Sequence, residues 1–373
     1  MKYVFVLSKE DVDIAKEEVL TLVNTTDCTL IENILIIDTK ENENTIKKSA
    51  KRLAYTNSIY SLLFESSYGD FLKNIEEYDW NSVYKDNFCI RANKPGTIDN
   101  CSILKKNPIK KPSINKKTFK NKIINKNNEK LYSEKNLASY VWKNVDNPKV
   151  DLKNAKTHIE IFFLEDKIYC CLLLKKLKHG FDERKSHLRP RPSPISLHPK
   201  LARAMVNLTW AGDGEIIFDP FCGSGGILIE SGLMGFGTIG YDINKKMVWK
   251  SMVNLKHYKI KNYKLGIKDF FKINKKYNYI VADLPYGLNT NIMENVRVTK
   301  SNKKQLQKYL IQFYSKIIKK LDKILIKRAV IIFPDYVNYK KIIKNSGINL
   351  KIINEFESYV HGNLTRKIVV MEK

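Results

Sequence analysis

The second half of the chain, from about residue 198, alternates between strand-like and helix-like segments. Short apolar runs rich in Ile, Val and Phe predict strands, and segments whose apolar residues recur every three or four positions predict helices. Regular alternation of this kind requires a mostly parallel, doubly wound sheet with helices on both faces. The last two strands follow each other without a helix, so we expect an antiparallel pair at one edge of this α/β fold.

The first half predicts two smaller α+β units. Its expected strands are 3–7, 30–37, 58–64, 88–92, 158–164 and 167–174, and its expected helices are 10–23, 45–53, 70–77 and 134–143. In the second half we expect strands at 215–218, 238–241, 264–267, 279–282, 328–333, 350–356 and 366–371, and helices at 200–209, 226–234, 245–258, 303–321 and 339–345. A chain of 373 residues is long enough for two or three compact domains.

The chain is strongly basic, and its charge is unevenly distributed. The formal net charge is +27; residues 1–100 carry 12 basic and 17 acidic side chains, a net −5, whereas residues 101–200 carry 24 and 9, a net +15. A local basic surface attracts polyanions such as nucleic acids. A compositional bias toward lysine is an alternative source of the charge, although the acidic first hundred residues argue against bias as the whole cause.

Two basic segments stand out. Residues 105–128 contain nine lysines and no acidic residue, which predicts a loop or a disordered insertion that is either a solvated spacer or a phosphate-binding segment. Residues 176–197 are rich in proline and predict an extended linker. Arginines on such a linker, Arg184, Arg189 and Arg191, are placed either to contact a sugar-phosphate backbone or simply to keep the tether in solution.

Several classes of protein are disfavoured by the sequence. No apolar run approaches the roughly 20 residues that a transmembrane helix needs, and the N-terminus does not resemble a signal peptide, so we expect a cytoplasmic protein. The six cysteines form no CxxC pair and have no histidines at zinc spacing. We therefore expect neither a disulfide framework nor a metal site.

A glycine-rich turn lies between the strand 215–218 and the following helix. It reads Asp219-Pro220-Phe221-Cys222-Gly223-Ser224-Gly225-Gly226. In an open α/β sheet this place is the carboxyl edge, where ligands bind. Glycines allow close approach of the backbone, the helix start favours a negative group, and Asp219 can accept a positive one. Dinucleotide enzymes share such turns, so the turn alone leaves both kinds of cofactor open.

The ends of the next two strands carry acidic residues. Asp242, followed by Ile243, lies about 20 residues beyond the glycine turn and can accept hydrogen bonds from ribose hydroxyls. Asp269 and Phe270 can hold an adenine ring between an acceptor and an apolar face. Together these groups fit a nucleoside joined to a charged amino acid, although each aspartate taken singly can also be a solvated strand-end residue.

The most specific motif is Asp283-Leu284-Pro285-Tyr286-Gly287, which follows the strand 279–282. Methylation of an exocyclic amine requires the nitrogen lone pair to point at the methyl group. The carboxylate of Asp283 and the carbonyl of Leu284 can accept the two N–H bonds of the amine, while Tyr286 stacks on the extruded base. A simple turn after the strand is the alternative interpretation.

Four segments of the sequence resemble one family. The run His198 to Leu208, the glycine turn and the closing Val360-His361-Gly362-Asn363-Leu364-Thr365-Arg366 are similar to archaeal tRNA (guanine-10-N2) methyltransferases, and residues 150–154 resemble part of their tRNA-binding THUMP domain. The resemblance implies a ferredoxin-like domain (1–66), a THUMP domain (67–175), a linker (176–197) and a Rossmann-like methyltransferase domain (198–373).

The resemblance also implies roles for individual residues. The residues that would hold S-adenosylmethionine are Asp219, Pro220, Gly223, Gly225, Asp242, Ile243, Asp269 and Phe270. Those that would hold the target amine are Asp283, Leu284, Pro285 and Tyr286. Those that would bind the tRNA are Lys153, Lys176, Arg184, Arg189 and Arg191. The expected product is N2-methyl- or N2,N2-dimethylguanosine at position 10. The alternatives are the same reaction at guanosine 6 of tRNA or in ribosomal RNA, or a non-catalytic tRNA-binding protein. The expected assembly is a monomer or a heterodimer with a small zinc-binding activator subunit.

The chain departs from the family pattern at one site residue. The family usually has Asp-Pro-Pro-Tyr where this chain has Leu284 in place of the first proline. The acceptor at this position is a backbone carbonyl, so the amine can still be held, but we expect a less rigid loop. A catalytic role for Cys222 would imply attack on a pyrimidine carbon, and we expect instead that this thiol packs beneath the glycine turn.

Overall fold

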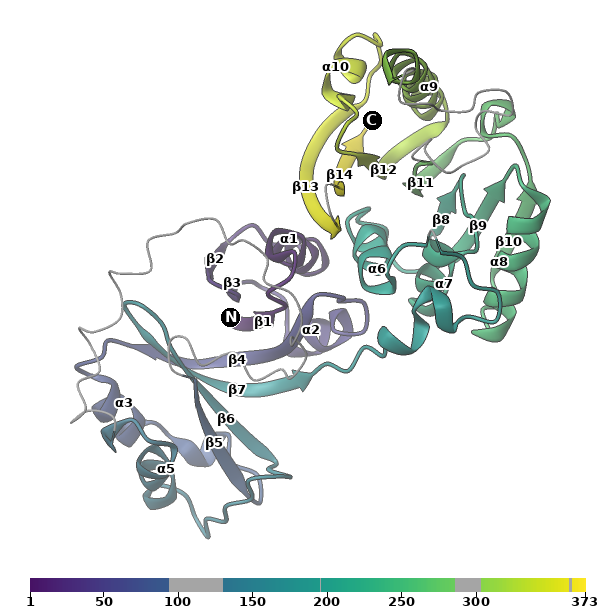
Figure 1. Cartoon of the computed structure of the whole chain (residues 1–373). Coiled ribbons are helices and arrows are strands. Elements are labelled where there is room, and N and C mark those ends of the chain that lie inside the picture. The colour runs from purple at the N-terminus through teal and green to yellow at the C-terminus, as the bar shows by residue number, and fades with distance from the viewer. Residues whose placement is uncertain (94–129, 195, 286–302, 362–363) are drawn as a thin grey trace. The chain divides into compact units, whose positions relative to one another are not determined.

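The structure is a computed structural model that describes residues 1–93, 130–194, 196–285, 303–361 and 364–373 (Figure 1). Contacts divide the chain into two compact units. The first unit comprises residues 1–6, 27–43 and 58–176, and the second comprises residues 7–26, 44–57 and 177–373. Two N-terminal segments therefore belong with the C-terminal half of the chain. The insertion 105–128 lies outside the described residues.

The first unit is built on a seven-stranded sheet in the order β2-β3-β1-β4-β7-β6-β5. The strands are β1 (Lys2–Leu7), β2 (Cys28–Ile31), β3 (Ile34–Asp38), β4 (Thr56–Ser66), β5 (Phe88–Asn93), β6 (Thr157–Phe163) and β7 (Ile168–Lys176). Strands β5 and β6 are parallel, whereas β4–β7 and β6–β7 are antiparallel. Strands before and after the expected boundary at residue 66 thus share one sheet.

One predicted strand of this unit is wrong. Residues 30–37, expected as a single strand, belong to the antiparallel hairpin of β2 and β3. Glu32 lies at the turn with a φ of 52°, in the left-handed region. The apolar residues on both sides of Glu32-Asn33 conceal the turn, because the run reads as one continuous strand.

An aromatic core packs against the edge of this sheet that β5 and β6 form. Helices α3 (Phe71–Glu77) and α5 (Glu134–Lys143), with the short 3₁₀ turn η1 (Trp80–Ser82), pack on β5 and β6. Phe71, Trp80, Phe88 and Phe163 are at most 1% exposed. Ser133 caps α5, since its hydroxyl accepts a hydrogen bond from the Asn136 N–H.

The second unit contains the predicted doubly wound sheet, in the order β10-β9-β8-β11-β12-β14-β13. The strands are β8 (Ile216–Asp219), β9 (Gly237–Asp242), β10 (Tyr263–Ile267), β11 (Tyr277–Asp283), β12 (Leu325–Pro334), β13 (Lys351–His361) and β14 (Leu364–Glu372). The five neighbouring strands β10, β9, β8, β11 and β12 pair in parallel. Strand β14 is antiparallel to both β12 and β13. The expected antiparallel pair at the edge is confirmed.

Helices cover this sheet in two groups. Helices α7 (Gly226–Leu233) and α8 (Lys245–His257) pack along β8, β9 and β10, as Figure 1 shows, around Leu228, Ile229 and Leu255. Helices α9 (Lys303–Ile324) and α10 (Tyr339–Lys344) bury a separate cluster that includes Phe218, Ile280 and Tyr314. No described helix is long and apolar enough to cross a membrane.

Three further helices complete the second unit. They are α1 (Val12–Val23), α2 (Glu43–Ser49) and α6 (Pro199–Asn207), and α1 contacts α6 directly. The linker forms two short 3₁₀ turns, η2 (Asp182–Arg184) and η3 (Ser186–Leu188). Between β10 and β11 the chain makes only the 3₁₀ turn η4 (Phe270–Lys272), where a longer helix usually covers a doubly wound sheet.

Candidate active site

A cleft of about 2180 Å³ lies at the carboxyl ends of the parallel strands of the second unit. Its walls are the loops after four strands, 219–224 after β8, 242–244 after β9, 268–271 after β10 and 283–285 after β11. Pockets for a single drug-sized ligand usually measure roughly 300–1,000 Å³, so this cleft has room for more than one such group. The four predicted loops therefore meet around one cavity. Tyr286 lies outside the described residues.

The glycine turn has the backbone conformation that its sequence predicts. Gly223 and Gly225 have φ angles of 50° and 88°, in the left-handed region that favours glycine. A Cβ on Gly225 would lie 2.6 Å from the Ser251 Oγ, whereas no described atom beyond the chain neighbours lies within 4 Å of the position that a Cβ on Gly223 would take. The turn thus forms an open cradle at Gly223 and a tight contact at Gly225.

Two aspartates lie beside the glycine turn. The Asp242 carboxylate accepts hydrogen bonds from the N–H groups of Gly223, at 3.0 Å, and Asn244, at 2.8 Å. Asp219 is 1% exposed and accepts one from the Phe221 N–H at 3.0 Å. Burial raises the pKa of the Asp219 carboxyl well above its ordinary value, and the nearby carboxylates of Asp242 and Asp283 raise it further. Burial also raises the pKa of Asp242.

Aromatic rings form the wall after β10. Phe270 is 4% exposed and lies 4.9 Å from the ring of Phe221, centroid to centroid. Asp269 caps η4 by accepting a hydrogen bond from the Phe271 N–H at 2.9 Å. This bond fixes the loop and leaves the second oxygen of Asp269 available to another donor.

The loop after β11 is anchored on both sides. Leu284 is 2% exposed, and its N–H donates to the Ile332 carbonyl of β12 at 3.4 Å. The Tyr314 hydroxyl of α9 donates to the Pro285 carbonyl at 2.9 Å. A proline at position 284 could not make the first of these bonds, so burial and hydrogen bonding hold the loop where the usual proline would stiffen it.

Cys222 is buried, as expected. It is 5% exposed, and burial raises the pKa of its thiol well above the ordinary value. A thiol of this kind remains protonated and is a poor nucleophile. The five cysteines of the described residues are all free.

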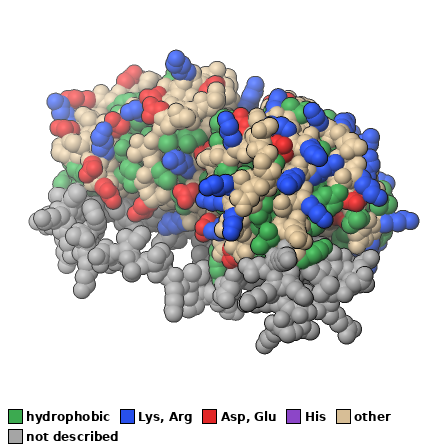
Figure 2. All heavy atoms as spheres, turned by 90° about the horizontal axis from the view of Figure 1, so that it is seen from above, with side chains coloured by type: hydrophobic (Ala, Val, Ile, Leu, Met, Phe, Trp, Pro, Cys, Tyr) green, Lys and Arg blue, Asp and Glu red, His purple; other side chains and the backbone are tan. Residues whose placement is uncertain are grey.

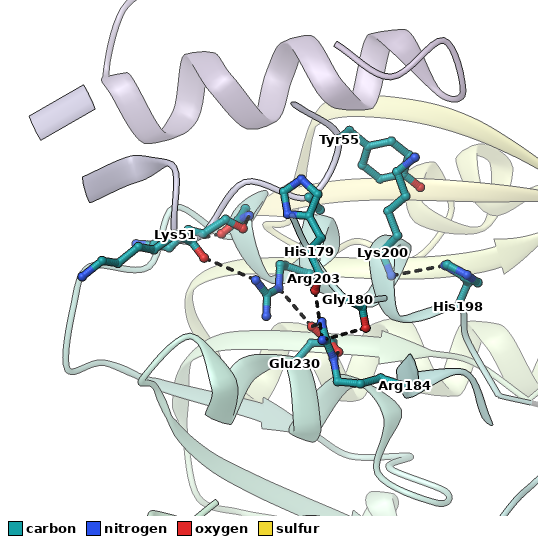
Figure 3. Close-up of polar contacts among 12 residues, drawn as sticks. Lys51, Tyr55, His179, Gly180, Arg184, His198, Lys200, Arg203 and Glu230 are labelled. Atoms are coloured by element: carbon teal, nitrogen blue, oxygen red, sulfur yellow. Dashed lines mark hydrogen bonds and ion pairs between the residues drawn. The ribbon is translucent and has the colours of Figure 1, made fainter. Parts of the chain in front are cut away.

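The predicted RNA-binding arginines of the linker differ in exposure. Arg184 binds the fully buried Glu230 through two hydrogen bonds, of 2.8 and 3.2 Å, and Arg203 of α6 binds the same carboxylate at 3.0 Å (Figure 3). Arg189 is 3% exposed and donates to the Arg184 carbonyl and to Ser196. Both guanidinium groups are held by hydrogen bonds within the second unit, and that of Arg189 is also buried, so in this conformation Arg184 and Arg189 hold the linker rather than face a phosphate.

The remaining predicted RNA-binding residues are exposed. Arg191 lies over the ring of Trp249, with 4.5 Å between the guanidinium carbon and the ring centroid. Lys153 and Lys176 are exposed on the first unit. These three side chains remain accessible to a polyanion.

A second polar network joins the N-terminal helices to α6. The buried Glu18 of α1 accepts hydrogen bonds from the N–H groups of Ala54 and Tyr55 and from the Asn207 amide at 2.6 Å. Burial raises the pKa of Glu18 to about 7. Figure 3 shows the neighbouring contacts, in which Arg203 donates to the Lys51 carbonyl and Lys200 lies over the ring of Tyr55.

Sequence reasoning missed these anchoring residues. One signal was present, because Glu230 is a lone charge within the apolar run Ile227-Leu228-Ile229, and a buried carboxylate needs cationic partners. Its partners are 46 and 27 positions away, and no pattern links them. The linker residues Ser186, His187 and Ser193, and the α6 N-cap residue His198, also line the cleft without having been predicted to do so.

Two protein families match this chain. Residues 186–367 match a family described as RMKL-like, methyltransferase domain, and residues 8–252 match a family of DNA methylases. The second match includes the glycine turn and Asp242 but ends before the loop that begins at Asp283. It therefore covers two of the three candidate cofactor loops, and neither the loop at Asp269 nor the candidate target loop.

Individual relatives are more specific. The chain is 35% identical to the probable tRNA (guanine(10)-N2)-dimethyltransferase of Methanothermococcus thermolithotrophicus, over 47% of this chain and 98% of that protein. It is 28% identical to the tRNA (guanine(10)-N2)-dimethyltransferase of Methanothermobacter thermautotrophicus, over 88% of this chain and 86% of that protein. The enzyme of the same name from Pyrococcus abyssi is 33% identical, over 60% of this chain and 64% of that protein.

Proposed function

Because the chain belongs to the tRNA (guanine(10)-N2)-dimethyltransferase family, we propose that it methylates the N2 amine of guanosine 10 in tRNA, with S-adenosylmethionine as the methyl donor. The observation that carries the proposal is the meeting of the four loops around one cleft. The loop that begins at Asp283, which would hold the amine, lines the same cleft as the glycine turn. A reaction between two bound groups needs this arrangement.

The residues of the cleft fit the proposed cofactor. The open cradle at Gly223 admits close backbone contact, and the buried Asp219 suits a positively charged amino group. Asp242 would accept hydrogen bonds from the ribose, and Pro220 and Ile243 also line the cleft. Gly225 is not part of the lining and would act by shaping the turn through its φ of 88°. Asp269 and Phe270 would hold the adenine.

The target amine would be held by the loop after β11. The carboxylate of Asp283 and the carbonyl of Leu284 would accept its two N–H bonds and orient the nitrogen lone pair. Pro285 shapes the loop, and Tyr286 would stack on the extruded guanine. S-adenosylmethionine, when bound, supplies an activated methyl group, so the protein needs no nucleophile of its own.

The tRNA would be held mainly by exposed basic residues outside the cleft. Lys153 and Lys176 of the first unit and Arg191 of the linker are accessible and remain in the proposed surface. Arg184 and Arg189 are left out because both are buried or ion-paired. The division into residues 1–66, 67–175, 176–197 and 198–373, with a THUMP domain second, remains part of this proposal, as does a cytoplasmic location.

The test is methylation of a tRNA transcript with labelled S-adenosylmethionine, followed by nucleoside analysis. We expect N2-methylguanosine and N2,N2-dimethylguanosine, and no label in a transcript whose guanosine 10 is replaced by adenosine. Label that persists in the replaced transcript would assign the chemistry to guanosine 6 or another site. Calorimetric titration with S-adenosylmethionine separates an enzyme from a non-catalytic tRNA-binding protein. Assays with and without a zinc-binding activator subunit would show whether one is needed.

A further inference from the structure

The cleft continues beyond the four loops along one face of helix α9. The residues of this helix that line the cleft are Tyr309, Gln312, Phe313, Lys316, Lys319, Lys320 and Lys323. Each of them lies three or four positions from another, so together they lie on one side of the helix. At a rise of about 1.5 Å per residue, the face extends roughly 20 Å from Tyr309 to Lys323. This length exceeds what a single nucleotide needs.

The opening beside α9 follows from the topology of the sheet. The connection from β10 to β11 contains only the short turn η4 in place of a longer helix. Phe271 of this turn is 38% exposed and lines the cleft. The cleft therefore leads without a break from the predicted adenine loop to the α9 face.

The end of this face nearest the loops is aromatic. The ring of Phe271 meets that of Phe313 edge to face, with 6.1 Å between centroids, and the rings of Tyr309 and Phe313 are nearly parallel at 6.4 Å. Tyr309 is 37% exposed. Partly exposed aromatic rings in a cleft are suited to stacking on nucleobases, and bases offer their faces only when they are unpaired.

The far end of the face is cationic. Within the described parts of the chain, no carboxylate lies within 4.0 Å of the ammonium groups of Lys316, Lys319 or Lys323, and Lys320 donates to the Asn274 side chain at 3.3 Å. The acidic residues that line the cleft, Asp219, Asp242, Asp269, Asp283 and Asp335, all belong to loops at the carboxyl ends of strands. Carboxylates in the cleft lining are therefore confined to the candidate active site, whereas the charged residues that line the cleft along α9 are all lysines.

Exposed lysines are common on this protein and do not by themselves mark a binding site. Lys and Arg side chains are spread over much of the face in Figure 2, and a solvated helix face commonly carries them. The α9 face differs because its lysines line a cleft, follow aromatic rings along one helix, and continue the cavity that contains the proposed target loop. A polyanion with flat apolar groups is the partner that complements all three features.

We propose that the α9 face binds an unpaired strand of the RNA substrate next to the nucleotide that is methylated. Bases of the strand stack on Phe271 and Tyr309, and its phosphates are bound by Lys316, Lys319 and Lys323. The inference rests on the proposed function and deepens it, since it assigns part of tRNA recognition to the same unit that holds the candidate active site.

The test compares two triple variants of the full chain. The first combines Lys316→Ala, Lys319→Ala and Lys323→Ala, and the control combines Lys341→Ala, Lys344→Ala and Lys351→Ala, three exposed lysines that do not line the cleft. We expect the first triple variant to bind a tRNA transcript on the order of tenfold more weakly than the control. Its slope of log affinity against log salt should be smaller in magnitude by about 2, as loss of three phosphate contacts to a single strand predicts.

A single variant tests the aromatic end. We expect Phe271→Ala to weaken binding of a short unpaired RNA oligonucleotide several-fold and to leave binding of a fully paired duplex unchanged. The affinity for S-adenosylmethionine should stay the same in the lysine triple variant. Equal tRNA affinities and salt slopes for the two triple variants would overturn the inference, even if the wild-type chain methylates guanosine 10. If the wild-type chain does not methylate tRNA but the lysine effect persists, the proposed function fails and the RNA-binding face stands.

Discussion

The carboxylate of Asp242, at the end of β9, accepts a hydrogen bond from the backbone N–H of Gly223, in the glycine turn after β8, at 3.0 Å. One oxygen thus fixes the turn, while the other accepts the Asn244 N–H at 2.8 Å. Each carboxylate oxygen has a second lone pair for a ligand. We therefore expect Asp242 to act on the proposed cofactor both directly, through the ribose, and indirectly, through the shape of the turn.

We expect Asp242→Ala to weaken binding of S-adenosylmethionine by roughly 10- to 100-fold, because a hydrogen bond to a charged group contributes about 1.5–3 kcal/mol. Asp242→Asn, which keeps one acceptor oxygen, should lie between the wild type and the alanine variant. Isothermal titration calorimetry measures both. Wild-type affinity in a folded Asp242→Ala protein would contradict the assignment of this residue.

The raised pKa of Asp219 predicts that cofactor binding depends on pH. The carboxyl must be ionised to bind an ammonium group, and burial favours its neutral form, so binding should release a proton. We expect affinity to fall as the pH is lowered from neutral. Titrations in two buffers of different ionisation enthalpy would measure the proton release. Asp219→Asn should abolish it and weaken binding, whereas the exposed Asp213→Asn should change neither.

The Glu230 carboxylate holds two arginines in the second unit. Its side chain is 0% exposed, and those of Arg184 and Arg203 are 14% and 10% exposed. Glu230→Gln leaves both guanidinium groups without a countercharge and should lower the free energy of unfolding by about 3–5 kcal/mol. Urea denaturation provides the measurement. The control is Glu215→Gln, which loses a partly exposed ion pair with Lys327 and should lower the free energy of unfolding by less than about 1 kcal/mol. Similar losses of unfolding free energy in both variants would contradict this account of the linker.

Much of the second unit could be predicted from sequence. Parallel strands end at the same edge of a sheet, so placing Asp219, Asp242, Asp269 and Asp283 at strand ends was enough to predict that their loops meet. The cleft lining confirms that meeting. The antiparallel edge pair followed in the same way from two strands without a helix between them.

Other features depend on contacts between residues that are far apart in the sequence. No local sequence pattern predicts such contacts. Glu18 and Asn207 are 189 positions apart, yet their hydrogen bond joins α1 to α6. The arginines of the linker looked like RNA ligands because a proline-rich segment is usually exposed, whereas Arg184 is committed to Glu230. Local patterns thus predicted the elements and missed the long-range polar contacts that hold them together.

The buried Glu18 predicts a pH dependence of stability. Its pKa rises from an ordinary 4.5 to about 7 in the folded chain. The folded state therefore binds the proton more tightly, so the stabilising contribution is fully present below pH 4.5 and is lost as the pH rises through about 7. Across this window the contribution changes by about 3 kcal/mol.

Urea denaturation of the wild type and of Glu18→Gln at several pH values tests this linkage. The difference between their free energies of unfolding should change with pH inside the window and remain constant above it. Glu10→Gln is a suitable control, since the Glu10 side chain is 71% exposed and pairs with Lys200 at the surface. Parallel curves for the wild type and Glu18→Gln would show that Glu18 does not titrate in this range.

The sharpest test of the active site is Asp283→Ala. The loop after β11 should keep its anchors at Leu284 and Pro285 in this variant, because the loop contributes only backbone groups to both bonds. Because we propose that the carboxylate orients the amine and does not contribute to docking, methylation of tRNA should be abolished. Affinities for tRNA and for S-adenosylmethionine should stay within a few-fold of the wild type. Filter binding and labelled methyl transfer on the same protein preparation separate the two effects, with the exposed Asp213→Ala as control. Retained methylation with lost tRNA affinity would move Asp283 from the reacting amine to the RNA-binding surface.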